Sequence, residues 1–155
     1  MALTKLNSFS MPTGSVLQVV SGSTSTQVNV ASTTYTDTGL TASITPSSTS
    51  SKILIIVSQN AGTDRDNNSG AMSMKLLRDS TNIQSQVYVG FIEAGGSSAV
   101  KNVGPWSITH LDSPSTTSSV TYKTQGIITN TSNNGTARFQ WDSGVSHMTL
   151  MEIAG

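Results

Sequence analysis

Two histidines and eight acidic residues are the groups in this chain that could carry out acid–base chemistry. His110 lies in the run Thr109-His110-Leu111-Asp112-Ser113, which brings an imidazole, a carboxylate and a hydroxyl close together in sequence; His147 lies far from it. A catalytic triad is defined by geometry and not by such closeness. Because 49 of the 155 residues are Ser or Thr, a neighbouring hydroxyl is expected by chance. We therefore expect both histidines to be ordinary strand or surface residues, and the chain not to be an enzyme.

The run from Asp64 to Gly70 resembles the start of a calcium-binding loop, since its carboxylates and amides could supply oxygen ligands. An EF-hand needs Gly at its sixth place and Glu at its twelfth, where this chain has Ser69 and Lys75. A looser calcium site on Asp64 and Asp66 is an alternative to the solvated hairpin tip that we expect. As an exposed tip, this loop supplies candidates for contacts with a partner molecule: Asp64, Arg65, Asp66, Asn67 and Asn68.

Three aromatic residues, Trp106, Trp141 and Tyr88, could stack on sugars at a surface. Trp106 follows a Gly-Pro turn, so we place it among the exposed recognition candidates. Trp141 shares an alternating pattern with Phe139, and polar residues occupy the positions between and beside them. That pattern predicts that Phe139 and Trp141 both point into the core.

The chain lacks the residues that several other kinds of site require. The absence of cysteine excludes disulfides, thiolate metal sites and a cysteine nucleophile. Gly95-Gly96 is not followed by the Lys of a phosphate-binding loop, and the carboxylates show no glycosidase-like pairing. We expect no cofactor.

The composition favours an all-β protein of an outer surface. Ser and Thr replace charge as the source of polarity: charged residues make up 10% of the chain, and its formal net charge is 0. Thr is β-branched and suits a half-exposed pleated surface. A neutral chain lacks the basic face of a nucleic-acid partner, and no apolar stretch reaches the ~18 residues of a membrane span. Residues 1–11 also lack the apolar centre of a signal peptide, so we expect synthesis in a cytoplasm.

Short segments of period two, separated by turn residues, follow one another from residue 16 onward. The polar stretch 60–70 is expected to be a loop, and residues 78–81 a hairpin tip. This pattern predicts an antiparallel β-sandwich, a jelly roll, over residues 16–155, preceded by an arm at residues 1–15. The expected strands are 16–20, 26–30, 33–40, 52–58, 71–78, 87–92, 106–111, 120–129, 137–141 and 148–153.

Two of these strands are apolar enough to be covered on both faces. The run 53–57 is continuously aliphatic, and the strand 148–153 is rich in Met and Leu. One face can line the core while the other meets further copies of the chain, and closed symmetric oligomers are the usual result of such surfaces. The interface candidates are Leu54, Ile56, Met148 and Leu150.

Several segments together resemble a module of tail-fibre-like proteins of bacteriophages, especially marine ones. The resemblance runs from about Gly14 to the C-terminus and is carried by the order and number of its segments. It implies a virion surface protein whose β module assembles as a homotrimer and has no catalytic motif. The matching segments are Gly14-Ser15-Val16-Leu17-Gln18-Val19-Val20, Tyr35 with Asp37-Thr38-Gly39-Leu40, Ile44-Thr45-Pro46-Ser47, Ser51-Lys52-Ile53-Leu54, Leu77-Arg78-Asp79-Ser80-Thr81-Asn82-Ile83, Leu111-Asp112-Ser113-Pro114, Tyr122-Lys123-Thr124-Gln125 and Thr149-Leu150-Met151-Glu152-Ile153.

The sequence is therefore interpreted as a non-enzymatic phage structural protein, a trimeric knob that binds a host surface glycan or protein. Decoration of the capsid is the alternative, and a glycan depolymerase with a site shared between subunits is a distant third. A short arm stands where fibres have a shaft, so we expect it to dock on another virion protein. Its apolar residues are Leu3, Leu6, Phe9 and Met11. Neither nucleic acid nor a membrane is an expected partner.

Overall fold

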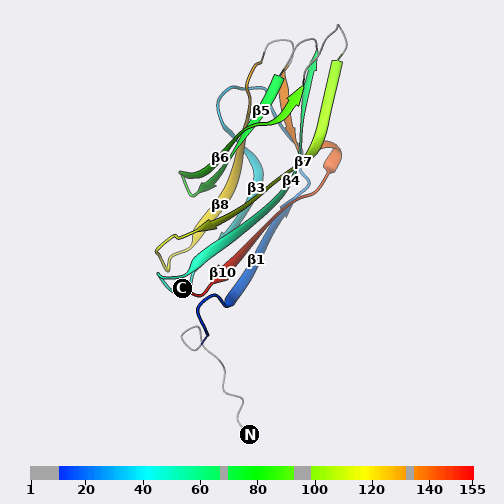
Figure 1. Cartoon of the computed structure of the whole chain (residues 1–155). Helices are drawn as coiled ribbons and strands as arrows, with labels where there is room; N and C mark the ends of the chain where they lie inside the picture. Colours follow the sequence, from blue (N-terminus) through cyan, green and yellow to red (C-terminus); the bar gives the residue numbers. More distant parts are fainter. Residues whose placement is uncertain (1–10, 67–69, 93–98, 132–134) are drawn as a thin grey trace.

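The computed structural model describes residues 11–66, 70–92, 99–131 and 135–155, and these form a sandwich of two antiparallel sheets (Figure 1). The 3-10 turn η3 (Trp141–Ser143) follows β9. No helix in the described ranges is long and apolar enough to cross a membrane. The strands are β1 (Val16–Thr24), β2 (Val28–Val30), β3 (Thr36–Ile44), β4 (Lys52–Asp66), β5 (Gly70–Arg78), β6 (Thr81–Ile92), β7 (Ala99–Asp112), β8 (Val120–Ile128), β9 (Thr136–Phe139) and β10 (Ser146–Ile153).

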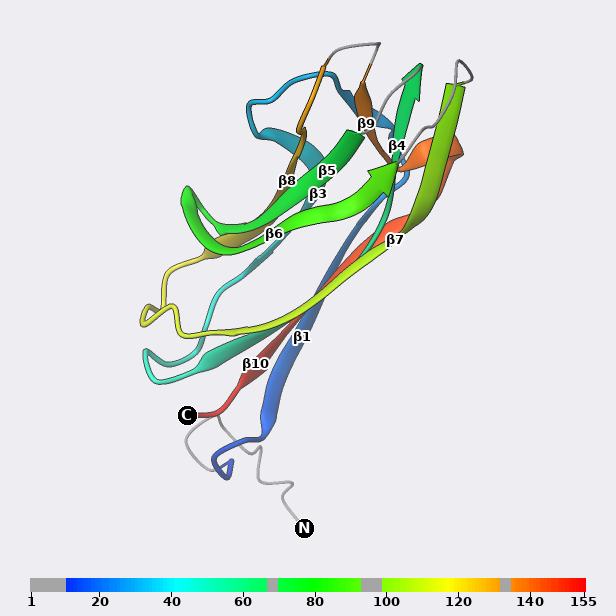
Figure 2. The same ribbon diagram turned by 45° about the horizontal axis from the view of Figure 1, so that its top comes forward.

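The strand order is that of a jelly roll. The six-stranded sheet has the order β1-β10-β4-β9-β2, with β7 along the other edge of β4, and the four-stranded sheet has the order β3-β8-β5-β6 (Figure 2). β10 pairs with the first half of β4 and β9 with the second half. Without the short β2 and β9, the eight long strands run 1-8-3-6 in one sheet and 2-7-4-5 in the other, as two Greek keys do. The predicted fold class is confirmed.

Alternation of apolar and polar residues explains most of these strands. In β8, every second residue from Val120 to Ile128 is buried, including Tyr122 and Gly126. In β4, Ile53, Ile55 and Val57 are fully buried between the sheets. Burial of each such side chain stabilises the fold by roughly 1.5–3 kcal/mol.

Both long edges of the sandwich are closed by contacts between the sheets. On one side, Gln18 Nε2 of β1 donates to the Thr45 carbonyl at 2.7 Å, and a side chain at Gly22 would overlap the backbone of β3. On the other side, Trp106 Nε1 of β7 donates to Gln86 Oε1 of β6, and His110 Nδ1 lies 2.8 Å from Gln84 Oε1. His110 therefore has a structural partner.

Strand lengths were underestimated from the sequence. The expected loop at 60–70 is wrong over most of its length, because β4 continues to Asp66 in unbroken register with β7, which begins at Ala99. The hairpin tip at residues 78–81 is confirmed, with Asp79 at a φ of 53°. Beyond its apolar run, β4 continues with Gln59, Ala61 and Thr63 as its buried residues.

Two interface candidates were assigned to the wrong face. Met148 and Leu150 are fully buried and pair with Val57 and Ile55, so they belong to the core of one chain. The outward face of β10 instead carries His147, Thr149, Met151 and Ile153. Leu54 and Ile56 do lie on the outer face of the sheet, opposite Met151 and Thr149.

The two tryptophans have exchanged the expected positions. Trp106 is buried at 5% exposure, whereas Trp141 is half-buried on the outer face of the six-stranded sheet. β9 ends at Phe139, and Gln140 adopts a left-handed conformation that breaks the alternation. Phe139 is buried as predicted, but the next inward position belongs to Gln140 and not to Trp141.

A buried carboxylate fastens the loop between β3 and β4. Glu152 is fully buried; its Oε1 accepts hydrogen bonds from Ser47 N and Oγ, both at 2.7 Å, and its Oε2 accepts one from Gln18 Nε2 at 2.6 Å. Burial alone would raise the pKa of Glu152, but the bonds from Ser47 and Gln18 favour the charged form and hold its pKa below the ordinary 4.5.

We expect acid to destabilise the fold through this residue. A carboxyl whose pKa is lower in the folded state contributes stability that is present above its unfolded pKa and is lost as the pH falls through the folded value. Thermal melts should therefore show a falling Tm below about pH 4.5. Glu152→Gln should be less stable at neutral pH and less sensitive to acid, although Asp37, whose pKa is also lowered, keeps part of the dependence. An unchanged acid slope in Glu152→Gln would contradict this assignment.

Candidate interaction surfaces

An apolar row crosses four strands on the outer face of the six-stranded sheet. Val19 of β1 pairs with Met151 of β10, Met151 with Leu54 of β4, and Leu54 with Leu111 of β7. Directly paired residues of antiparallel strands share one face, so the four side chains are contiguous. Val19 is 57% exposed and Leu111 51%, while Leu54 and Met151 are half-buried. We call these four residues the outer apolar row.

The neighbouring row on the same face is also uncharged. It consists of Ser21, Thr149, Ile56 and Thr109, with Ile56 39% exposed. Aliphatic side chains bordered by small hydroxyls form a contiguous exposed apolar patch of the kind that marks a protein interface. Because neither row carries a charge, a second copy of the same surface can approach it without repulsion.

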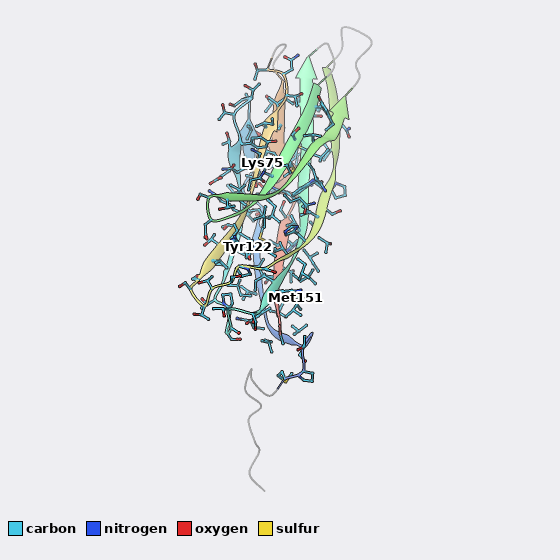
Figure 3. The ribbon with its side chains drawn as sticks, turned by 60° about the vertical axis from the view of Figure 1, so that its left-hand side comes forward. Lys75, Tyr122 and Met151 are labelled. Carbon is cyan, nitrogen blue, oxygen red and sulfur yellow. The ribbon has the colours of Figure 1, made fainter. Side chains whose placement is uncertain are left out.

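The outer face of the four-stranded sheet is different in character. Lys123 and Asp37 form an exposed ion pair at 2.9 Å, and Lys75 Nζ lies 3.8 Å from the centre of the Tyr35 ring. Figure 3 shows Lys75 on this sheet and Met151 on the other. The charged face suits contact with solvent, and the uncharged face suits contact with protein.

A second surface feature lies further along β4, at the turn that carries Trp141. The Cε3 and Cζ3 atoms of its indole lie against Gly62 of β4, where an added Cβ would come within 2.7 Å and 3.0 Å of them. A side chain at that position would displace the ring, so Gly62 makes room for it. Gly62 lies eight positions after Leu54, which places the ring of Trp141 about 26 Å from the outer apolar row along the strand.

The backbone around Trp141 is held in an unusual conformation. Gln140, Asp142 and Ser143 have φ values of 52°, 50° and 63°, in the left-handed region that side chains other than glycine rarely adopt. Such residues cost of order 1–3 kcal/mol each and persist only where surrounding contacts impose them. Here Trp141 N donates to Asn60 Oδ1 at 2.8 Å, and Asp142 N donates to Gln27 Oε1 at 3.1 Å.

The buried amide of Gln140 anchors this turn from below. This amide is assigned the orientation in which every neighbour is complementary: the nitrogen then donates to the carbonyls of Thr38 and Thr26 at 3.0 Å and 3.1 Å, and the oxygen accepts from Gln59 Nε2 at 3.1 Å and Ser146 Oγ at 2.9 Å. A fully buried amide with four partners fixes the chain rigidly, since each bond lost would leave a buried polar group unpaired. The orientation of Trp141 is therefore set by the core.

Two cationic side chains lie over the indole of Trp141. Arg138 donates to Asp64 Oδ2 from Nη2 at 2.8 Å and from Nε at 3.2 Å, and its Cζ lies 5.1 Å from the centre of the Trp141 ring. Lys101 Nζ lies 5.5 Å from the same ring. Cations at such distances are attracted to an indole. We call Trp141, Asp64, Lys101 and Arg138 the Trp141 cluster.

The structure separates the recognition residues suggested by the sequence. Asp64 joins the Trp141 cluster, whereas Trp106 is buried and no longer a candidate. Arg65 and Asp66 belong to the β4 backbone, but their side chains, together with Asn67 and Asn68, lie outside the described part of the chain. Tyr88 is 66% exposed on β6. The turn signal Asp142-Ser143-Gly144 could have shown that the alternation ends before Trp141.

The acid–base candidates serve the fold. Asp112 accepts bonds from both Arg78 Nη1, at 2.9 and 3.0 Å, and the Tyr122 hydroxyl, at 2.8 Å, so it is not paired with His110. Burial, and then the bond to Asp112, raise the pKa of Tyr122 far above its ordinary value of 10. Figure 3 shows Tyr122 between the sheets. In the described ranges, no three acidic or histidine side chains gather to hold a metal, and Asp64 is neutralised by Arg138.

No protein-family model matches the chain, and no curated protein does. Among solved structures the chain is similar to the VP2 subviral particle of infectious bursal disease virus, with a TM-score of 0.49, 10% identity and coverage of 91% of this chain and 34% of that one. It is also similar to the T13 particle of that virus, with a TM-score of 0.42, 8% identity and coverage of 91% and 36%. For dimeric latent PorU from Porphyromonas gingivalis the TM-score is 0.38, the identity 10% and the coverage 93% and 14%.

The chain thus spans little more than a third of the matched viral chains and less of PorU. At these identities and TM-scores the similarities carry no argument about function.

Proposed function

We propose that the chain is a non-enzymatic structural protein of a bacteriophage virion, a homotrimeric surface knob of the tail-fibre type that takes part in host recognition. The observation that carries the proposal is the outer apolar row on one face, opposite a charged face on the other sheet. The resemblance of the segments from Gly14 onward to phage tail-fibre-like modules supports it. The jelly-roll strand order is compatible with it, since viral capsid proteins and lectins use this fold.

The outer apolar row is the proposed contact between copies. Leu54 and Met151 are its centre, with Ile56 beside them, and these replace Met148 and Leu150 as interface residues. Three copies that pack this face about a common axis would cover Val19 and Leu111, which are half exposed in the single chain. The charged outer faces of the four-stranded sheets would then point to solvent.

Attachment to the particle is proposed for the arm. Leu3, Leu6 and Phe9 lie outside the described residues. Met11 lines an open hollow of about 260 Å³ with Leu17 and Ala154, beside the C-terminal residue Gly155. We expect the arm to leave the knob at this pole and to dock on another virion protein. Capsid decoration is the second candidate, since the same fold and the same docking serve it equally well.

One set of variants tests the assembly and the attachment. The wild-type chain should sediment as a trimer at micromolar concentration, and Leu54→Glu, which places a carboxylate in each copy of the interface, should sediment as a folded monomer. Ser43→Glu, on the outer face of the four-stranded sheet, is the matched control and should stay trimeric. A chain deleted for residues 2–11 should remain trimeric but be missing from virions.

Labelled chain on intact virions decides the location. A label on the tail is expected, and a label on the head would favour capsid decoration instead. A monomeric wild-type chain, or an arm deletion that enters particles at normal occupancy, would contradict the corresponding half of the proposal.

A further inference from the structure

We propose that the Trp141 cluster is a carbohydrate-binding site that takes one pyranose ring of a glycan. The inference deepens the proposed function, because it names the chemical class of the recognised ligand and the residues that bind it. It stands on three observations: the partial exposure of Trp141, the rigidity of its turn, and the polar groups that surround the ring.

A partly exposed indole offers an apolar surface to a flat apolar partner. The carbon-bound hydrogens of a pyranose form such a surface, and they carry the partial positive charge that the face of an aromatic ring attracts. Part of the ring rests on Gly62, so a ligand approaches Trp141 from the solvent side of the sheet. Each Å² of apolar indole surface that a ligand covers contributes ~25 cal/mol to the free energy of binding.

The rigidity of the turn lowers the entropy cost of binding. The buried amide of Gln140 and the bond from Trp141 N to Asn60 hold the ring in place before any ligand arrives. Three left-handed residues are kept at a cost to stability, and strain of that kind clusters at binding sites. A preorganised aromatic ring loses little freedom when it stacks.

The bordering charges match the hydroxyls of a sugar. Both hydrogen bonds from Arg138 to Asp64 end on Oδ2, and Oδ1 is a second acceptor atom of the same carboxylate. The cationic groups of Arg138 and Lys101, which lie over the ring, are hydrogen-bond donors. A neutral sugar can use this set as alternating donors and acceptors, and an acidic sugar can place its carboxylate beside Lys101.

The two tryptophans make the site measurable in the intact chain. Each indole Nε1–H gives its own signal in a ¹⁵N-correlated NMR spectrum, and the variants Trp141→Phe and Trp106→Phe assign the two signals. Methyl glucopyranoside, methyl galactopyranoside and the two corresponding methyl glycosides of glucuronic and galacturonic acid are titrated separately, to 100 mM. At least one should shift the Trp141 signal in a saturable way. The Trp106 signal, from an indole that is buried and bonded to Gln86, should stay in place.

Variants separate stacking from a general effect on the fold. Trp141→Ala should weaken binding at least about tenfold, equal to about 1.4 kcal/mol. Trp141→Phe should retain part of the affinity. Lys101→Gln should weaken binding of the uronic acid glycosides more than binding of the neutral glycosides, because only an acidic sugar places a carboxylate beside the lost charge. All three variants should remain trimeric.

Three results would overturn the proposal: no glycoside shifting the Trp141 signal, both signals moving together, or Trp141→Ala dissociating the trimer, which would make the cluster a contact between copies. A chain that binds glycosides but is absent from virions would leave the site standing and contradict the proposed function. If the chain is found in virions but no glycoside shifts its Trp141 signal, the proposed function stands and the carbohydrate site is contradicted.

Discussion

Replacing Phe139 by alanine is expected to lower the free energy of unfolding by ~3–5 kcal/mol, the loss typical of a large aromatic cavity. Phe139 is fully buried, and its ring lies against Gly126 of the facing sheet, where any added side chain would overlap it. The two residues are complementary, so the space left by the ring has no neighbour that can fill it. Urea unfolding at a fixed chain concentration measures the loss, since assembly contributes to the apparent stability.

Trp141→Ala is the matched control for this prediction. It stands two residues further along and is also an aromatic-to-alanine change, but its indole is half-buried on the outer surface. We expect it to cost only ~1 kcal/mol. Equal losses from the two variants would show that Trp141 belongs to the core after all.

Removing the carboxylate of Asp112 is the second change with a large expected effect, a loss of ~3 kcal/mol or more in the free energy of unfolding. Asp112 is 8% exposed and is shared by Arg78 and the buried hydroxyl of Tyr122. Asp112→Ala leaves the buried Tyr122 hydroxyl without its acceptor and leaves the partly buried Arg78 guanidinium with only the long 3.5 Å bond to the Ser113 carbonyl. Asp112→Asn should be milder, because its one oxygen can still accept from one of them.

Asp37→Ala is the control for the buried pair. Asp37 accepts from Lys123 at 2.9 Å and from Gln125 at 2.6 Å, but it lies exposed on the surface. An exposed ion pair is worth at most ~1 kcal/mol. If chemical denaturation gave losses as large for Asp37→Ala as for Asp112→Ala, burial would not be what makes the Asp112 cluster matter.

The sequence predicts those parts of the fold in which the polarity of a side chain matches its burial. The alternating residues of β8 and the inward residues of the apolar run of β4 are predicted correctly: Tyr122 and Ile128 are buried while Lys123 and Gln125 lie on the outside, and Ile53, Ile55 and Val57 are fully buried. Gln140 could not be predicted in the same way: its polar side chain is buried because four partners that are far apart from it or from one another in the sequence satisfy its amide. Because the side chain of Gln140 points inward, the side chain of Trp141 points outward. The buried amide of Gln140 is therefore the reason that the predicted inward position of Trp141 is wrong.

The interaction surfaces depend on register, which a single strand does not reveal. Leu54 and Ile56 were identified from a two-sided strand, but Val19, Met151 and Leu111 join them only because β1, β10 and β7 pair at particular positions. The Trp141 cluster likewise draws Asp64, Lys101 and Arg138 from three strands. Asp64 was suggested for its charge, and the others had no local signal.

The hydrogen bonds that join the start of β1 to the residues after β10 have a practical consequence. Gly14 N donates to the Ala154 carbonyl, and Ala154 N to the Ser15 carbonyl, both at 2.8 Å, so the two ends of the sandwich emerge side by side at one pole. A domain whose two ends lie side by side can be inserted into a loop of an unrelated host protein without separating the ends of that loop. The chain can equally be circularly permuted, with new ends at the tight turn of residues 79–80 and the old ends joined by a few glycines. The knob is therefore suited to insertion into engineered scaffolds.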